Sequence, residues 1–115
     1  MKAAQITGYR KIEIKDVPDL GELENGKVRF KTECISICGS DIHGAFDKVL
    51  PEEDYPLPPG MPIHEVASIA VESKDDRYPV GTRAIIIPNY RNPDGSIGTG
   101  GAVEYIDQTH DKIIK

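Results

Sequence analysis

The sequence has little cysteine and no long apolar run, and both scarcities narrow the class of protein. Only Cys34 and Cys38 occur among the 115 residues. Without a secretion signal, such thiols are expected to be reduced, ligating or buried rather than bridged. The opening residues turn polar at Thr7, too early for a secretory signal, and no apolar stretch approaches membrane-spanning length. These features predict a cytoplasmic protein without a membrane segment.

Positive charge is also scarce, which argues against binding to nucleic acid or to an anionic membrane. The formal net charge is -5, and Lys and Arg form no dense cluster that could neutralise phosphates. Hydrophobic residues make up 38% of the chain and charged residues 29%, which is typical of a folded globular protein. At this length we expect one domain with a packed core.

Alternation of apolar and polar residues predicts a mainly β fold with short helical segments. Lys11 to Lys15 shows the pattern most clearly, as a half-buried strand. Further strands are expected at residues 28–32, 66–72, 82–87 and 102–106. The helical candidate in the first half is Ser40 to Phe46, where Ser40 or Asp41 could act as the N-cap.

Two irregular stretches interrupt this β pattern. Five of the nine prolines fall between Pro51 and Pro62, a density that excludes a regular helix or a central strand. Asn89 to Gly101 is a second loop, rich in Gly, Asn and Pro. Because loops on a rigid sheet often carry binding and catalytic groups, we expect the chemistry at residues 38–46 and at the loop leading into His64.

The segment Cys38-Gly39-Ser40-Asp41-Ile42-His43 gathers a thiol, a hydroxyl, a carboxylate and an imidazole. Zinc accepts thiolate, imidazole and carboxylate ligands, and a catalytic site takes three from the protein. Cys38 with His64 and Glu65 would meet that description in part, although 26 residues separate Cys38 from His64, so tertiary folding must bring them together. A purely structural interpretation stays open: a buried thiol at Cys38, a hydrogen-bonded His64 and a surface His43.

Four motifs in order resemble the zinc-dependent medium-chain dehydrogenase family, whose N-terminal half is a GroES-like partial β-barrel. The family has a Cys-Gly-(Ser/Thr)-Asp-x-His segment, a Gly-His-Glu opening a strand, a Val-Gly-(Asp/Thr)-Arg-Val turn and a Gly-Gly-x-(Ala/Val)-Glu-Tyr strand. The corresponding segments here are residues 38–43, 62–71, 80–84 and 100–105. Ile63 departs from this pattern, because the family usually has Gly there.

The resemblance implies a role for each residue of the candidate site. Cys38, His64 and Glu65 would bind one catalytic zinc, with Glu65 either a direct ligand or a nearby carboxylate. Asp41 would orient a ligand from the second coordination shell. Ser40 would hydrogen-bond the reacting hydroxyl, and His43 would relay its proton toward solvent. For Ser40 and Asp41 helix capping is an equal alternative.

The resemblance also implies what lies outside these residues. No four-cysteine lobe for a structural zinc is present, and no GxGxxG fingerprint for NAD or NADP. In the family a Rossmann cofactor domain follows, a further zinc ligand lies beyond residue 115, and the full-length enzyme is expected to be a homo-oligomer. Residues 1–115 would be the substrate-and-metal domain, a fragment inactive alone.

The expected activity is oxidation of an alcohol or polyol by zinc-assisted hydride transfer to NAD or NADP. Ile86-Ile87-Pro88-Asn89, Ile63 and the missing lobe are similar to the ribitol-5-phosphate dehydrogenase branch. Two alternatives are a noncatalytic GroES-like binding or assembly module and a zinc-independent reductase, although the latter lacks ligands at these positions. Outside the motifs, Cys34 is expected in the core and His110 in an ordinary loop.

Overall fold

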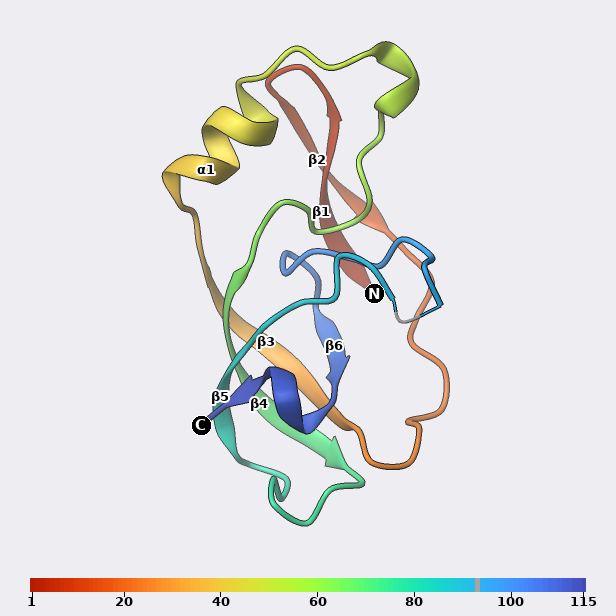
Figure 1. The fold of residues 1–115 in the computed structure, drawn as a ribbon, viewed down its shortest axis with the longest axis vertical. Coiled ribbons are helices and arrows are strands. Elements are labelled where there is room, and N and C mark those ends of the chain that lie inside the picture. Colours follow the sequence, from red (N-terminus) through yellow and green to blue (C-terminus); the bar gives the residue numbers. More distant parts are fainter. Residues whose placement is uncertain (93) are drawn as a thin grey trace.

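The computed structural model of the chain describes residues 1–92 and 94–115, which form two β-sheets joined by long loops. In the two-stranded sheet, β1 (Lys2–Gly8) pairs antiparallel with β2 (Lys11–Asp16). A five-stranded sheet has the order β6-β3-β4-β5-β7. Its members are β3 (Val28–Ser36), β4 (Glu65–Ser73), β5 (Arg83–Ile86), β6 (Tyr105–Gln108) and β7 (Ile113–Ile114). Figure 1 shows the β1–β2 hairpin standing above this sheet.

The long antiparallel pair β3–β4 forms the centre of the five-stranded sheet. Its register runs from Val28 opposite Ser73 to Ser36 opposite Glu65, with two irregularities along the way. Alternate residues such as Phe30, Val66 and Ile86 on neighbouring strands are buried in one core, as expected for a sheet with one packed face. The predicted mainly β class, a curled sheet consistent with a GroES-like partial barrel, is confirmed.

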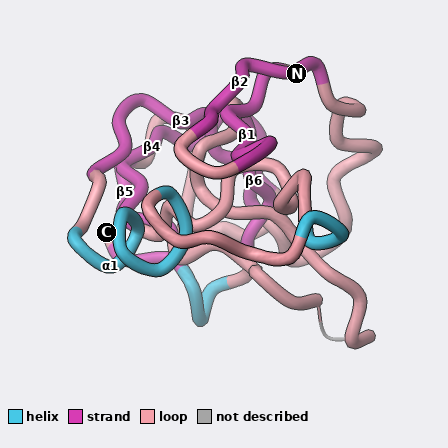
Figure 2. The backbone as a smooth tube through the Cα atoms, turned by 90° about the horizontal axis from the view of Figure 1, so that it is seen from above, coloured by secondary structure: helices cyan, strands magenta, loops and turns pink. Residues whose placement is uncertain are grey.

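Short helical segments and loops complete the chain. The helical segments are α1 (Gly39–Asp41), the π-helical turn η1 (Ile42–Phe46), and the 3-10 turns η2 (Glu52–Asp54) and η3 (His110–Lys112). Figure 2 shows that loops, more than helices, surround the strands. In the part of the chain that the structure describes, no helix is long and apolar enough to cross a membrane.

Three expectations about local structure were wrong. The N-cap of α1 is Cys38, whose Sγ accepts a hydrogen bond from the Ser40 N–H at 3.3 Å, so neither Ser40 nor Asp41 begins the helix. Cys34 is exposed and not part of the core, because the second half of β3 runs past the end of its pairing with β6. His110 begins a 3-10 turn, where its Nδ1 lies 2.6 Å from the Tyr78 hydroxyl.

The strand pattern was better predicted in position than in burial. β2 covers the expected segment, but Ile12 and Ile14 are 53% and 68% exposed, so its apolar face is not half-buried. The last predicted strand, 102–106, is shifted toward the C-terminus: β6 begins at Tyr105, and Val103 makes an isolated bridge with Ala3. Backbone bonds to the first sheet therefore replace part of the expected ladder.

Two glycines allow the loop before His64 to pack against the loop before β6. A Cβ on Gly100 would lie 2.2 Å from the Gly60 carbonyl oxygen, and Gly60 has a φ of +79°, a conformation open to glycine. The Gly101 N–H donates to the Ile63 carbonyl at 2.7 Å, and the Gly100 N–H to the Pro59 carbonyl at 2.9 Å. The segment that leads into His64 is therefore held by backbone bonds.

Candidate metal centre

Three side chains of metal-ligand type meet where β3 ends and β4 begins. One ligand atom each of Cys38, His64 and Glu65 lies within 4.8 Å of the others. The antiparallel register explains this meeting, because it places Ser36, at the end of β3, opposite Glu65, at the start of β4. Strand pairing thus brings together two residues that are 26 positions apart in the sequence. His64 precedes β4, so it need not alternate with Glu65 across a sheet face.

The buried carboxylate of Asp41 contacts this cluster. Asp41 is 4% exposed. Its Oδ2 accepts a hydrogen bond from the Cys38 N–H at 2.9 Å, and its Oδ1 lies 3.2 Å from Nδ1 of His64. One carboxylate therefore contacts the residues that carry two of the three candidate ligands. Its bond to the Cys38 N–H also completes a capping box at the start of α1, so Asp41 stabilises the helix start and contacts His64 at the same time.

The His64 ring has two different environments at its two nitrogens. Nδ1 faces the Asp41 carboxylate and the Pro62 carbonyl oxygen, the latter at 3.3 Å. Nε2 lies on the other side, 4.0 Å from a carboxylate oxygen of Glu65. The Pro62 carbonyl, with Asp41 adding a charge interaction, raises the pKa of His64. A proton on Nδ1 would leave Nε2 as the free lone pair that a metal needs.

Cys38 and Ser40 form the second contact pair of the site. The Cys38 sulfur lies 2.8 Å from the Ser40 hydroxyl. Hydrogen bonds from the Ser40 hydroxyl and N–H stabilise a thiolate and lower the pKa of the Cys38 thiol. Ser40 itself is exposed, so its hydroxyl is also open to a molecule arriving from solvent.

His43 lies apart from these residues. It is exposed on η1, and among the described hydrogen bonds and ion pairs none joins it to Cys38, Ser40 or His64. The pKa of the Asp47 carboxyl is lowered chiefly by a hydrogen bond from Arg10, and His43 contributes a smaller charge interaction. Its side chain is thus near Asp47, at the solvent side of the turn.

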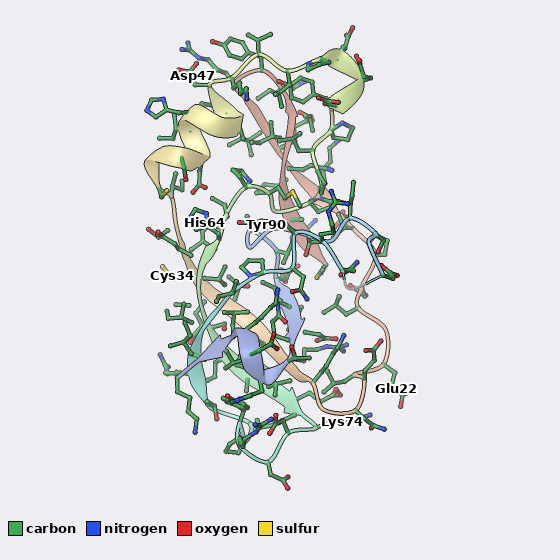
Figure 3. All side chains as sticks on the ribbon, viewed as in Figure 1. Glu22, Cys34, Asp47, His64, Lys74 and Tyr90 are labelled. Carbon is green, nitrogen blue, oxygen red and sulfur yellow. The ribbon has the colours of Figure 1, made fainter. Side chains whose placement is uncertain are left out.

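Tyr90 is a residue of the site that no sequence pattern indicated. Its hydroxyl donates a hydrogen bond to the Pro62 carbonyl oxygen at 2.8 Å, the same oxygen that faces His64. Figure 3 labels both Tyr90 and His64 in this part of the molecule. Tyr90 belongs to the loop 89–101, where a lone aromatic among Gly, Asn and Pro gave no signal of its contact.

The donor set fits a zinc ion. It combines a thiol with a lowered pKa, an imidazole with one nitrogen already engaged, and a carboxylate, the ligand types that zinc accepts. Ligand atoms around a tetrahedral zinc are separated by about 3.5 Å, given the usual bond lengths. The observed limit of 4.8 Å is therefore within reach of side-chain rotation, because Glu65 is exposed.

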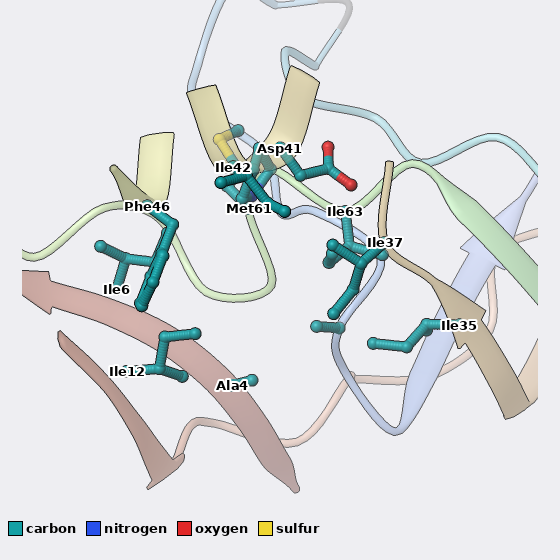
Figure 4. Close-up of a pocket in the computed structure, with 12 residues that line it drawn as sticks. Ala4, Ile6, Ile12, Ile35, Ile37, Asp41, Ile42, Phe46, Met61 and Ile63 are labelled. Carbon is teal, nitrogen blue, oxygen red and sulfur yellow. The ribbon is translucent and has the colours of Figure 1, made fainter. Parts of the chain in front are cut away.

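An apolar cavity of about 350 Å³ lies beside the helical segments. Figure 4 shows Ile6 and Ile12 of the hairpin facing Ile42 and Phe46 of η1 across it. Asp41 is the charged residue among those that line it. The exposed Ile12 of β2 and Ile35 near the end of β3 are among the residues that line it.

Comparison with curated proteins finds one relative that is similar in sequence. An alcohol dehydrogenase from Geobacillus stearothermophilus is 37% identical over 76 residues, which cover 63% of this chain and 20% of that protein. No family model matches the chain. The chain therefore spans about a fifth of the length of this relative.

Solved structures of low sequence identity share the fold. The 2R,3R-butanediol dehydrogenase from Bacillus subtilis has a TM-score of 0.67 and 23% identity, covering 99% of this chain and 40% of that one. TarJ from S. aureus, in complex with NADPH, has a TM-score of 0.69 and 18% identity, covering 98% and 32%.

The fold is shared with the solved dehydrogenases, and the ligand-type cluster lies within it. The expected resemblance is confirmed: the chain is similar in sequence to an alcohol dehydrogenase and shares the fold of solved alcohol and polyol dehydrogenases. The solved structures establish the fold alone, so the narrower likeness to the ribitol-5-phosphate branch stays a prediction.

Proposed function

We propose that the chain is the zinc-binding catalytic domain of an NAD(P)-dependent alcohol or polyol dehydrogenase. The observation that carries the proposal is the proximity of Cys38, His64 and Glu65, with the buried Asp41 in contact with His64 and Cys38. The relationship to an alcohol dehydrogenase supports the same conclusion. An alternative noncatalytic module would have no use for a thiol, an imidazole and a carboxylate converging on one point.

Cys38, His64 and Glu65 would hold the metal, with Asp41 orienting two of them. Zinc bound there would supply Lewis-acid activation of a substrate oxygen. Cys38 would bind as thiolate, favoured by the Ser40 hydrogen bonds. His64 would present Nε2, because Asp41 and the Pro62 carbonyl occupy the Nδ1 side.

Ser40 and His43 are the residues proposed to move the substrate proton. The exposed Ser40 hydroxyl lies beside Cys38, where it could accept a hydrogen bond from a substrate hydroxyl. His43 lies three residues after Ser40, in η1, and its proposed relay role rests on the family pattern. Its exposure suits a group that exchanges protons with water.

The remaining parts of the proposal concern the whole enzyme. We propose that NAD or NADP accepts the hydride and is held by a Rossmann domain partner, with a small alcohol or polyol as substrate. The TarJ neighbour solved with NADPH supports a nicotinamide cofactor. One catalytic zinc, no structural zinc, a homo-oligomeric full-length enzyme and a cytoplasmic location likewise stay proposals.

Metal content tests the proposal without requiring turnover. Residues 1–115, purified in the presence of zinc and then dialysed, should contain close to one zinc per chain. Cys38→Ala and His64→Ala should lose it. Cys34→Ala is the matched control, because it removes the exposed thiol four residues before Cys38 and should keep the metal. A folded, metal-free wild type whose stability is unaffected by zinc would support the noncatalytic module instead.

A further inference from the structure

Tyr90 ties the second loop to the backbone just before His64. Its hydroxyl donates to the Pro62 carbonyl oxygen at 2.8 Å, across 28 residues of sequence. Burial, with a contribution from the nearby Asp41 charge, raises the pKa of Tyr90 to about 12. The hydroxyl therefore keeps its proton at physiological pH and acts toward Pro62 as a donor.

The Pro62 carbonyl has no partner in the described backbone hydrogen bonds outside the strands and helices. Its contacts are the Tyr90 hydroxyl and the Nδ1 of His64, at 2.8 and 3.3 Å. Pro62 has no N–H of its own, and the β4 ladder begins only at Glu65. The N–H at the other end of this peptide unit, that of Ile63, donates to the Gly60 carbonyl at 3.2 Å. The Tyr90 hydroxyl adds a second bond to the unit, at the oxygen that faces His64.

Two acceptors then face the same ring nitrogen. The Asp41 carboxylate lies 3.2 Å from Nδ1, and the Pro62 carbonyl shares that side of the ring. Because neither is a donor, both favour the tautomer with the proton on Nδ1. Nε2 is left without a proton, on the side where Glu65 lies.

We propose that Tyr90 is a positioning residue for the metal site. By holding the Pro62 carbonyl against His64, it keeps the imidazole proton on Nδ1 and the Nε2 lone pair directed at the metal position. This inference rests on the proposed function for its consequence, zinc affinity. Its cause, the tautomer of His64, is a property of the metal-free protein and can be measured separately.

The test is nitrogen-15 NMR of the His64 ring in metal-free residues 1–115, at about pH 9, where an imidazole is neutral. The wild type should show His64 with the proton on Nδ1. Tyr90→Phe keeps the ring and removes only the hydroxyl, and it should raise the population with the proton on Nε2. Tyr9→Phe is the matched control, since it removes a tyrosine hydroxyl bonded to Asp47 at the surface, and it should leave the tautomer unchanged.

Zinc affinity is the second readout. Tyr90→Phe should weaken zinc binding roughly tenfold, the lower end of the range for partners outside the ligand shell, and Tyr9→Phe should not. Unchanged tautomer and affinity in a folded Tyr90→Phe protein would overturn the inference. A wild type with the His64 proton on Nε2 would also overturn it, whether or not the variant folds. A wild type that has the expected tautomer but binds no zinc would overturn the proposed function and leave the tautomer role of Tyr90 in place.

Discussion

The Asp41 carboxylate lies 3.2 Å from Nδ1 of His64 while its other oxygen accepts the Cys38 N–H. This relationship couples two candidate ligands through one buried group. Asp41→Asn should therefore weaken zinc binding by roughly 10- to 100-fold, because an amide presents its NH₂ to one of two donors. Competition with a chromogenic chelator would measure the affinity.

Asp47→Asn is the control for that variant. Asp47 follows η1 and is bonded to Arg10 and Tyr9 at the surface, so its loss removes a carboxylate from the same region without touching the cluster. Equal weakening by both variants would show that general negative charge, and not the position of Asp41, matters for the metal.

Gly100 and Gly60 are too close for any side chain between them. Gly100→Ala should lower the free energy of unfolding by about 1–3 kcal/mol or more, because its Cβ would meet backbone atoms that cannot move as a side chain can. Urea unfolding followed by circular dichroism would measure the change. Gly44→Ala is the matched control: its Cβ would meet nothing within 4 Å, and it should be neutral or stabilising by up to about 1 kcal/mol. Equal stability of the two variants would mean that the loops are not packed as described.

Asp75 is expected to make the domain less stable as the pH falls into the acid range. Hydrogen bonds from the Arg77 side chain and N–H lower the pKa of Asp75 from 3.8 to about 2. A depressed pKa in the folded state stabilises the protein above the unfolded pKa, and this stability is lost as pH falls from about 4 toward 2. Asp75→Asn should remove that part of the acid transition, measured by urea unfolding at several pH values. Asp76→Asn, at the next residue, should leave the loss of stability at acid pH unchanged. If Asp75→Asn also leaves that loss unchanged, the contact between Asp75 and Arg77 is contradicted.

Turnover should be absent from residues 1–115 alone. The described residues contain a β domain with a ligand cluster and no strand-helix-strand unit for a dinucleotide. Purified protein with zinc, NAD or NADP and a panel of alcohols and polyols should show no cofactor reduction by absorbance. Reduction that depends on Cys38 would contradict the proposed division of labour between two domains.

The sequence predicted the proximity of Cys38, His64 and Glu65 better than it predicted the structure around them. Cys38, His64 and Glu65 were expected to meet because their order matched a family pattern, and the β3–β4 register brings them together. Their roles, with those of Ser40, Asp41 and His43, stay predictions. The position of Tyr90 could not be read, since it depends on how the loop 89–101 returns over Pro62, which has no local signature.

The errors have a common physical origin in tertiary contacts. Cys34 was expected in the core, yet β3 pairs with β6 only as far as Lys31, and the rest of β3 is exposed on that side. Cys38 displaced Ser40 as the N-cap because its sulfur accepts the Ser40 N–H. Ile12 and Ile14 are exposed because the second sheet has only two strands. The periodicity of a sequence identifies a strand, but it does not show which elements pack against that strand.

Cobalt substitution tests the central claim most directly, because a thiolate bound to Co²⁺ gives a charge-transfer band in the near ultraviolet. Residues 1–115 titrated with Co²⁺ should develop this band, together with visible bands of low coordination number, to an end point of one ion per chain. The charge-transfer band should persist in Cys34→Ala and vanish in Cys38→Ala. A band that survives loss of Cys38, or one that never forms in the folded wild type, would contradict a metal centre built on Cys38, His64 and Glu65.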